Sequence, residues 1–288
     1  MKQSKIQNLK SKIKNYLPLI KTLQTGLLLS TGIAGYMSAH ASFQLLTFLG
    51  LTASLFLAIS GSTILNMWYD RDIDTVMDRT HNRPLASGKI SQHEALRLGL
   101  LLALLGVGWA VAIKPLYGLI VFAGLFFDVV VYTIWLKRRT CWSIVWGGIS
   151  GGMPILAGRA LAIGRIDLVG ILLTMAVLFW IPTHILTFSM RYFKDYHAAK
   201  VPTFPSTYSF EATRAIIALS AIIAAASIGV AGVMIGVQAG AMRLMVVLAS
   251  GLLLLSFATV FRPSEQINFG LFKYASLYMM ASMILVSI

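Results

Sequence analysis

Long apolar stretches recur along almost the whole chain, and they constrain its fold more than any other feature. A helix that crosses a bilayer needs about 20 consecutive apolar residues, and nine such stretches leave no room in the chain for a separate soluble domain. The sequence therefore predicts an all-α integral membrane protein, a bundle of about nine transmembrane helices. The predicted spans are 18–38, 43–65, 96–113, 116–136, 142–163, 168–190, 214–236, 243–261 and 270–288.

The composition excludes the other common classes of protein. Hydrophobic residues make up 57% of the 288 residues and charged residues only 12%, against about 25% charged in a typical soluble domain. So few charges cannot cover the surface of a soluble protein of this size. The single cysteine, Cys141, excludes an intrachain disulfide framework.

The net charge of +14 has two possible explanations, which differ in where the basic residues lie. Clustered bases in a soluble protein would suggest nucleic acid, whereas membrane proteins collect bases in cytoplasmic loops. With nine spans, 20 of the 24 Lys and Arg residues fall on the side of the N-terminal arm. We therefore expect no nucleic-acid partner, a cytoplasmic N-terminus and an extracytoplasmic C-terminus in a multi-pass protein of the cell membrane. Residues 1–17 form a basic cytoplasmic arm, and 18–288 form one transmembrane domain.

An acidic motif stands at the cytoplasmic end of the second span. Asn66, Asp70 and Asp74 are spaced four residues apart, which places them along one face of a helix. An amide and two carboxylates at this spacing offer the oxygen ligands that Mg²⁺ prefers. The alternative is a solvated helix end, in which Arg71 and Arg79 neutralise the acids.

Basic residues follow the acidic motif directly, from Arg79 through Arg83 to Lys89. Guanidinium and ammonium groups suit phosphate oxygens, and Mg²⁺ commonly binds through a few carboxylates together with substrate phosphates. Acids and bases in this order therefore predict a diphosphate site in a cytoplasm-facing active-site cavity.

These motifs resemble those of the UbiA-type intramembrane prenyltransferases, which also have nine spans. The first motif reads Asn66-x-x-x-Asp70-x-x-x-Asp74, followed by Arg79-Thr-x-x-Arg83-Pro84-Leu. Other segments are most similar to the heme-farnesylating branch, the protoheme IX farnesyltransferases, and the resemblance covers nearly the whole chain. They are Tyr132-Thr-x-Trp135-Leu-Lys137-Arg-Arg-Thr140, Pro182-x-His184 and Asp195-Tyr196-x-x-Ala199-x-Val201-Pro202.

The resemblance implies a specific reaction and specific site residues. Farnesyl diphosphate would be the donor, heme B the acceptor and Mg²⁺ the cofactor, and a vinyl group would be alkylated with addition of water to give heme O. The lipid bilayer and a later heme-modifying enzyme are the other implied partners. The residues carried over are Asn66, Asp70, Asp74 and Asp195 for the metal and catalysis; Arg79, Arg83, Lys137, Arg138, Lys194 and Lys21 for the diphosphate; and His184 for the heme.

Three positions depart from the pattern of the family. Lys21-Thr22 stands where the family has Lys-Pro, and Lys194 stands where the heme branch has the first carboxylate of its second motif. Lys200 replaces the usual glycine after that motif. A missing carboxylate leaves Asp195 as the one acid expected from this loop.

Two polar residues inside the spans allow more than one interpretation. His184 would either contact the porphyrin or pack as a polar helix residue. Asp128 is a lone acid in the fourth span, where a charge is costly; it is expected to be protonated, paired with a base or turned toward the cavity.

Two other functions remain as alternatives. Another UbiA-type enzyme would prenylate an aromatic quinone precursor or a glycerol-phosphate lipid. An ion-coupled transporter would use the acids as an ion site, but carriers place such groups near the bilayer midplane, whereas these lie at the cytoplasmic end.

Overall fold

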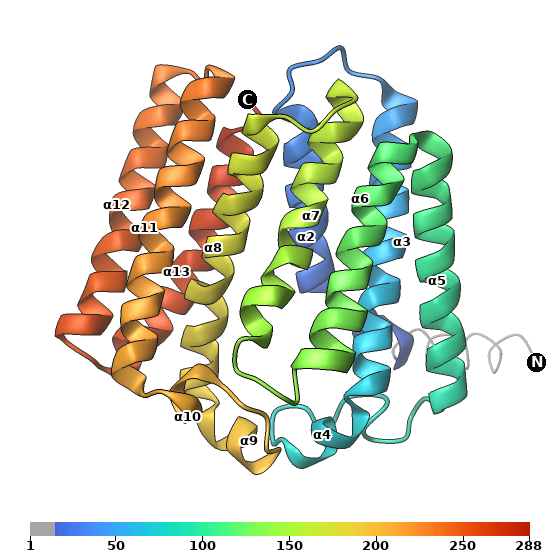
Figure 1. Ribbon diagram of the computed structural model, residues 1–288, viewed down its shortest axis with the longest axis vertical. Coiled ribbons are helices and arrows are strands. Elements are labelled where there is room, and N and C mark those ends of the chain that lie inside the picture. Colours follow the sequence, from blue (N-terminus) through green and yellow to red (C-terminus); the bar gives the residue numbers. More distant parts are fainter. Residues whose placement is uncertain (1–14) are drawn as a thin grey trace, which may run out of the picture.

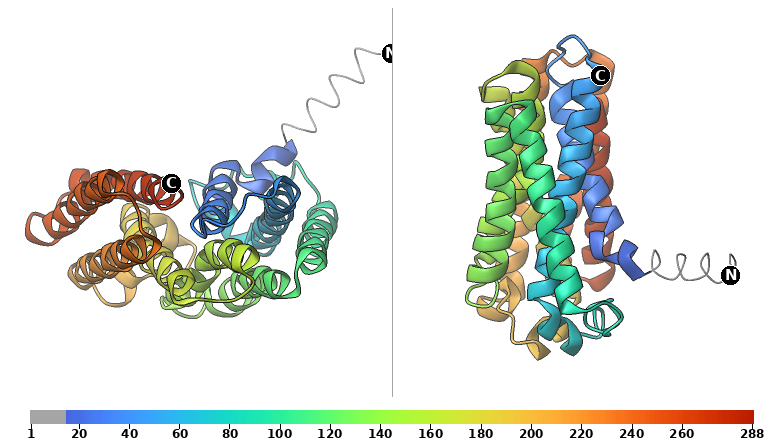
Figure 2. Two further views of the ribbon diagram at one scale, coloured as in Figure 1. Left: turned by 90° about the horizontal axis from the view of Figure 1, so that it is seen from above. Right: turned by 90° about the vertical axis from the view of Figure 1, so that its right-hand side faces the viewer.

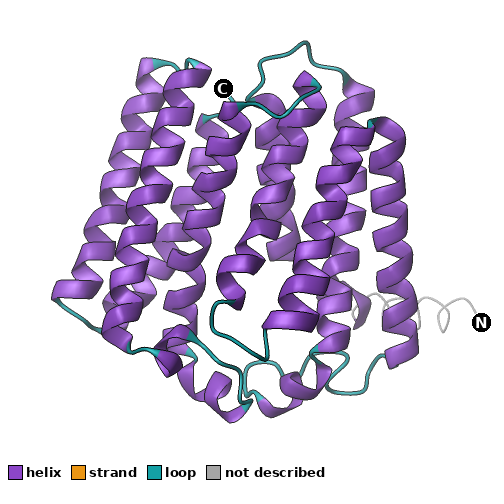
Figure 3. Ribbon diagram, viewed as in Figure 1, coloured by secondary structure: helices purple, strands orange, loops and turns teal. Residues whose placement is uncertain are grey.

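The computed structural model describes residues 15–288, so most of the predicted basic arm, 1–17, lies outside the described residues. Within this range nine long helices run up and down the molecule, joined by loops and short helices, without a strand (Figure 1, Figure 3). They are α2 (Thr22–Met37), α3 (Leu45–Tyr69), α5 (Gln92–Ile113), α6 (Pro115–Phe126) with its π-helical continuation η2 (Phe127–Leu136), α7 (Ser143–Ile163), α8 (Leu168–Arg191), α11 (Phe210–Ile235), α12 (Ala239–Phe261) and α13 (Glu265–Leu285).

The described part of the chain confirms a helical membrane fold. Six helices are long and apolar enough to cross a membrane: α3, α5, α6 with η2, α8, α11 and α12. The other three, α2, α7 and α13, are shorter or less apolar and run alongside them (Figure 1). The first predicted span is interrupted, because the 3₁₀ turn η1 (Leu17–Ile20) ends at Lys21, whose φ of 43° is left-handed, before α2 begins.

The helices form a ring in chain order, which divides into two groups (Figure 2). Each helix contacts the next, and α13 contacts α2 to close the ring. Contacts between α2 and α7 close the first group, which holds α2, α3, α5, α6 and α7. Contacts between α8 and α13 close the second, which holds α8, α11, α12 and α13.

The crossing of α2 and α7 depends on glycine. A Cβ atom at Gly35 would lie 2.0 Å from the carbonyl oxygen of Ile155, and one at Gly158 would lie 1.9 Å from that of Gly32. Both distances are far below van der Waals contact. The two backbones therefore approach as closely as small residues allow, which is a common way for membrane helices to associate.

The two long loops predicted from the sequence lie at the same end of the bundle (Figure 1). The first contains α4 (Arg71–Val76), and the second contains α9 (Phe193–Ala198) and α10 (Phe204–Thr207). A small apolar cluster of Ile73, Met77 and Val201 packs one loop against the other. The C-terminus lies at the opposite end (Figure 1).

The predicted cytoplasm-facing cavity stays a prediction. An apolar hollow lined by Leu46, Gly50, Trp109 and Ile113 lies where α3 begins and α5 ends, at the end remote from the two loops. Its lining carries none of the predicted site residues.

Candidate active site

The acidic motif keeps its helical spacing through a one-residue break. Helix α3 ends at Tyr69, Asp70 caps it, and α4 begins at Arg71. The backbone N–H of Asp70 donates to the carbonyl of Asn66 at 3.0 Å, and that of Asp74 donates to the carbonyl of Asp70 at 2.9 Å. Asn66, Asp70 and Asp74 therefore still share one face, and all three are buried, with 8%, 1% and 4% of their surface exposed.

Basic side chains from three segments neutralise this face. Lys137 donates to Asp70 Oδ2, and Arg83 donates to both carboxylate oxygens of Asp74 at 2.9 and 2.8 Å. Lys21 Nζ donates to Asn66 Oδ1 at 3.0 Å. Four of the six predicted diphosphate-binding bases, counting Arg138, therefore surround the acidic motif.

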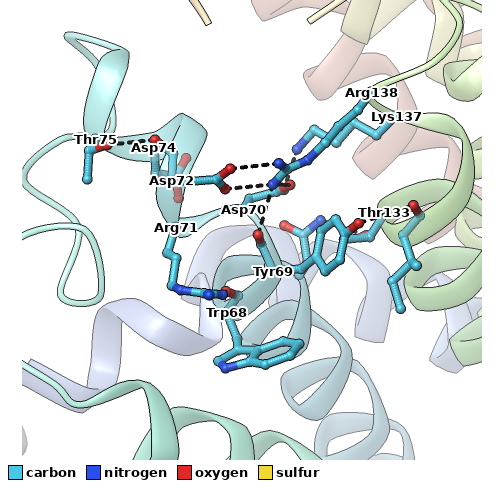
Figure 4. A network of polar contacts seen from close by, with 12 residues as sticks. Trp68, Tyr69, Asp70, Arg71, Asp72, Asp74, Thr75, Thr133, Lys137 and Arg138 are labelled. Atoms are coloured by element: carbon cyan, nitrogen blue, oxygen red, sulfur yellow. Dashed lines mark hydrogen bonds and ion pairs between the residues drawn. The ribbon is translucent and has the colours of Figure 1, made fainter.

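Arg138 binds the exposed acid beside the motif. Its guanidinium donates to both oxygens of Asp72 at 2.7 and 2.6 Å, and to the carbonyl of Tyr69 at 2.9 Å (Figure 4). The hydrogen bond from Arg138 holds the pKa of Asp72 below its usual range. The predicted alternative, in which Arg71 and Arg79 neutralise the acids, does not describe this arrangement, because Arg71 donates to the carbonyl of Trp68 and Arg79 lies over two aromatic rings.

One oxygen of the acidic face has no partner. Asp70 Oδ1 is fully buried and accepts no hydrogen bond from any described residue, and the nearest recorded base, Arg138, is 4.0 Å away. A buried carboxylate oxygen without a donor is costly. Such an oxygen fits a cation ligand, and Asp70 Oδ1 is therefore the atom of this site that best fits Mg²⁺.

The acids do not by themselves form a metal cage. Within residues 15–288 no three His, Cys, Asp or Glu side chains converge as metal ligands. Mg²⁺ usually takes only one or two carboxylates and completes its shell with water and substrate phosphates. The donor set therefore fits Mg²⁺ held jointly with a diphosphate and not Mg²⁺ held by protein alone.

The second loop reaches the first through Asp195. Its Oδ2 accepts from the backbone N–H of Arg79 at 3.3 Å, and the Ile73–Val201 contact lies beside it. Lys194 is exposed and has no recorded contact. Asp195 thus contacts the loop that follows the acidic motif. It has no hydrogen bond in common with Asp70 or Asp74.

Lys200 shows what the departure from the family's glycine costs. Its φ is 53°, in the left-handed region that favours glycine. A non-glycine residue pays roughly 1–2 kcal/mol for this conformation. The loop therefore keeps the backbone shape that a glycine would adopt without strain.

Asp128 is tied to the acidic face through α3. Its Oδ2 accepts from Ser62, one helical turn below Asn66, at 2.5 Å. Thr133 donates to the carbonyl of Asp128 at 2.7 Å and accepts from Asn66 Nδ2 at 2.8 Å. The π-helical segment η2 thus supports the amide of the motif, a contribution of Thr133 and Ser62 that the sequence analysis did not identify.

His184 lies in an aromatic stack away from the acids. Its ring centroid lies 4.9 Å from that of Trp180 and 4.4 Å from that of Phe272. Its Nδ1 is 3.2 Å from the hydroxyl of Ser276. No recorded contact joins His184 to the acidic motif. Trp180 and Phe272 stack on the His184 ring, so its faces are not open to a ligand in this arrangement.

Comparison with known proteins gives the fold and the family. The model of the UbiA prenyltransferase family matches residues 27–277. A protoheme IX farnesyltransferase of Korarchaeum cryptofilum is 43% identical over 215 residues, covering 75% of this chain and 73% of the relative. One of Archaeoglobus fulgidus is 42% identical over 200 residues, covering 69% and 70%.

Solved structures with the same fold are more distant in sequence. A chain from a structural study of digeranylgeranylglyceryl phosphate synthase in membranes has a TM-score of 0.80, 18% identity and coverage of 96% of this chain and 97% of its own. A UbiA homolog from Archaeoglobus fulgidus bound to DMAPP and Mg²⁺ has a TM-score of 0.70, 16% identity and coverage of 95% and 99%. The nine-helix ring, the paired acids and bases, and the matching family model together show that the chain belongs to the UbiA prenyltransferase family of multi-pass membrane proteins.

Proposed function

We propose that the protein transfers the farnesyl group of farnesyl diphosphate to a vinyl group of heme B, with addition of water, to give heme O. Relatives of 38–43% identity named protoheme IX farnesyltransferase support this acceptor. The observation that carries the proposed chemistry is the buried face of Asn66, Asp70 and Asp74, with Asp70 Oδ1 left without a donor.

The difficult step is the break between C1 of the farnesyl chain and the diphosphate oxygen, which leaves negative charge on the diphosphate. Lys137, Arg83 and Lys21 can release the protein oxygens that they now contact and bind phosphate oxygens. Such groups stabilise charge that develops in a transition state. Mg²⁺ held by Asp70 and Asp74, with Asn66 and Asp195 as further candidate ligands, would supply Lewis-acid stabilisation.

The bonds made and broken then balance. C1 of the allylic chain forms a carbon–carbon bond with the terminal vinyl carbon, and the positive charge moves to the carbon next to the pyrrole. Water adds there and loses a proton, so heme B, farnesyl diphosphate and water become heme O, diphosphate and H⁺. The apolar chain of the donor lies among helices because it is hydrocarbon.

We also propose that the end of the bundle that carries the two loops is cytoplasmic. Of the Lys and Arg residues described, fifteen lie at this end and four at the other, namely Lys114, Arg159, Arg165 and Arg243. This asymmetry follows the positive-inside rule. The N-terminus would then be cytoplasmic and the C-terminus, at the other end, extracytoplasmic (Figure 1).

One assay tests the reaction. Membranes containing the protein are incubated with farnesyl diphosphate, heme B and Mg²⁺, and the products are analysed by mass spectrometry. The proposal predicts heme O and its loss when Mg²⁺ is chelated. Prenylation of an aromatic quinone precursor or of a glycerol-phosphate lipid in parallel incubations, without heme O, would assign the protein to another acceptor.

A further inference from the structure

A stripe of rings follows α8 at a spacing of four residues. We call it the aromatic strip; it consists of Trp180, His184 and Phe188 on α8, Tyr192 at the C-cap of α8, and Phe269 and Phe272 on α13. All six side chains are half-buried, whereas neighbours on α8 such as Leu186 and Met190 are buried in the core of the second helix group. Trp180, at one end of the strip, packs against this core and donates to the carbonyl of Ala275 at 2.7 Å, whereas the other five rings are not part of the core cluster.

The rings of the strip contact one another in an unbroken series. Trp180 stacks on His184, and His184 on Phe272 at 4.4 Å. The ring centroid of Phe272 lies 5.6 Å from that of Phe188 and 6.0 Å from that of Phe269. The centroids of Phe188 and Tyr192 are 4.5 Å apart. Four residues per step over twelve residues give a length of about 18 Å along α8.

The strip begins beside the acidic site. The guanidinium of Arg79 lies 4.8 Å from the Phe188 ring and 5.5 Å from the Tyr192 ring. The backbone of the same residue donates to Asp195. Since Arg79 belongs to the loop of the first helix group, the strip faces that group at its cytoplasmic end and runs from there toward the middle of the bundle.

Two further bases stand over the end of the strip. Arg191 lies 3.9 Å and Lys273 lies 4.5 Å from the centre of the Phe269 ring. Both are exposed, and neither forms an ion pair with a described residue. The bases at the acidic face, in contrast, are already bound to side-chain oxygens: Lys137 and Arg83 to carboxylates and Lys21 to the amide of Asn66. Arg191 and Lys273 are thus available to an anion that comes with the ligand.

We propose that the aromatic strip binds the acceptor, a flat apolar macrocycle, and that Arg191 and Lys273 bind its carboxylate groups. This inference rests on the proposed function, because it identifies where the heme lies. Flat apolar ligands pack well against aromatic side chains, and Arg and Lys form charge-assisted hydrogen bonds with carboxylates. The two carboxylates of heme B lie on the edge opposite its two vinyl groups.

This orientation explains how an acceptor with two charges enters a membrane bundle. Arg191 and Lys273 hold the carboxylates at the cytoplasmic end, where water is available. The macrocycle then extends along Phe188 and Phe272 toward His184, and its vinyl edge lies inside the bundle. Neither base was among the residues predicted from the sequence motifs.

The test measures binding of protoporphyrin IX, which has the carboxylates but no iron, and of its dimethyl ester, which has the same ring without charge. Purified protein in nanodiscs of zwitterionic lipid is titrated with each, and quenching of tryptophan fluorescence reports binding. The variant carries Arg191→Gln and Lys273→Gln. A matched control carries Arg139→Gln and Arg262→Gln, two exposed bases at the same end with no recorded contact to the strip.

The double variant should bind protoporphyrin IX at least about tenfold more weakly for each cation lost, as expected for charge-assisted bonds. The control should bind as the unaltered protein does. The dimethyl ester should bind the unaltered protein as weakly as protoporphyrin IX binds the double variant. The double variant should bind the ester as well as the unaltered protein does. The comparison of the acid with its ester uses the unaltered protein. It therefore holds even if a variant is poorly produced.

Equal affinity of the unaltered protein for the acid and the ester would overturn the inference while leaving the proposed function intact. The double variant could instead bind both porphyrins normally and lose only a preference for anionic lipid. That result would assign the two bases to lipid headgroups and would also overturn the inference. If the unaltered protein binds neither porphyrin, the inference and the proposed function both fail.

Discussion

A group of ion pairs and a single ion pair lie at opposite ends of this bundle, and they differ in how many of their polar atoms have a hydrogen-bond partner. At the end remote from the loops, Arg159 donates to Asp167 from Nε at 2.8 Å and from Nη2 at 2.7 Å, and its Nη1 donates to the carbonyl of Ser38. Asp167 also accepts from the backbone of Gly170 and so caps α8. Each charged group there has its partners.

At the end that carries the two loops, the same residue types leave some buried polar atoms without a partner. Asp70 Oδ1 and Arg138 Nε are buried without a hydrogen-bond partner within the described chain, although bases crowd the acidic face. An ion pair that serves stability satisfies its atoms, whereas a binding site keeps an unsatisfied atom for its ligand. Substitutions at the two ends of the bundle test this difference.

Neutralising the acids at the loop end should abolish activity. Asp70→Asn and Asp74→Asn should each lower the rate of heme O formation by roughly 10²–10³-fold, as removal of one group that stabilises transition-state charge commonly does. Asp167→Asn is the matched control and should retain its rate per folded molecule. Initial rates and circular dichroism measure the two quantities. Normal turnover in Asp70→Asn or in Asp74→Asn would contradict the assignment.

Breaking the remote pair should instead reduce stability. Arg159→Ala leaves the carboxylate of Asp167 without its guanidinium, and loss of one partner from a buried pair costs about 3–5 kcal/mol. Asp167 is partly exposed, with 22% of its side chain accessible, so the lower end is expected. Reversible unfolding in mixed detergent measures the free energy. An unchanged free energy of unfolding would show that the pair is not a structural one.

Removing a base from the acidic face should increase the response to metal. Lys137→Met leaves Asp70 unneutralised, and Mg²⁺ without any diphosphate should then stabilise the variant more than the unaltered protein. A difference of about 1 kcal/mol corresponds to about 2–4 °C in Tm for a large chain. Thermal melting with and without Mg²⁺ measures it. An identical shift in both proteins would argue that Lys137 and Mg²⁺ do not compete for Asp70.

The smallest expected effect is on thermal stability at acidic pH. The hydrogen bond from Arg159 lowers the pKa of Asp167 below its usual value of 3.8. A carboxylate whose pKa is lower in the folded state adds stability above pH 3.8, and that stability is lost as the pH falls through the lowered value. Thermal melting as the pH is lowered below 3.8 should show a steeper fall for the unaltered protein than for Asp167→Asn. Equal slopes would contradict the role of this pair.

Much of the fold could be predicted because the bilayer imposes a simple rule on sequence. The nine helices, the two loops at one end and the helical spacing of Asn66, Asp70 and Asp74 all follow from apolar length and four-residue periodicity. What periodicity could not predict is which base meets which acid. Lys137 reaches Asp70 from 67 residues away, and only the packing of η2 beside α3 determines that contact.

The four-residue spacing of the aromatic strip can be read from the sequence, but this spacing alone does not indicate a binding site. Trp180, His184, Phe188 and Tyr192 are spaced by four, yet aromatic residues at this spacing commonly form ordinary core in a membrane helix. Only the structure shows that they are half-buried and that Arg191 and Lys273 stand over Phe269 from two different helices.

Metal binding tests directly whether the unsatisfied oxygen of Asp70 is a ligand for a metal ion that binds together with diphosphate. Electron paramagnetic resonance can follow Mn²⁺, a paramagnetic substitute for Mg²⁺, with and without a slowly ionising thio analogue of farnesyl diphosphate. The account predicts tight Mn²⁺ binding only with the analogue, its loss in Asp70→Asn and its retention in Asp167→Asn. Unchanged Mn²⁺ binding in Asp70→Asn would contradict it.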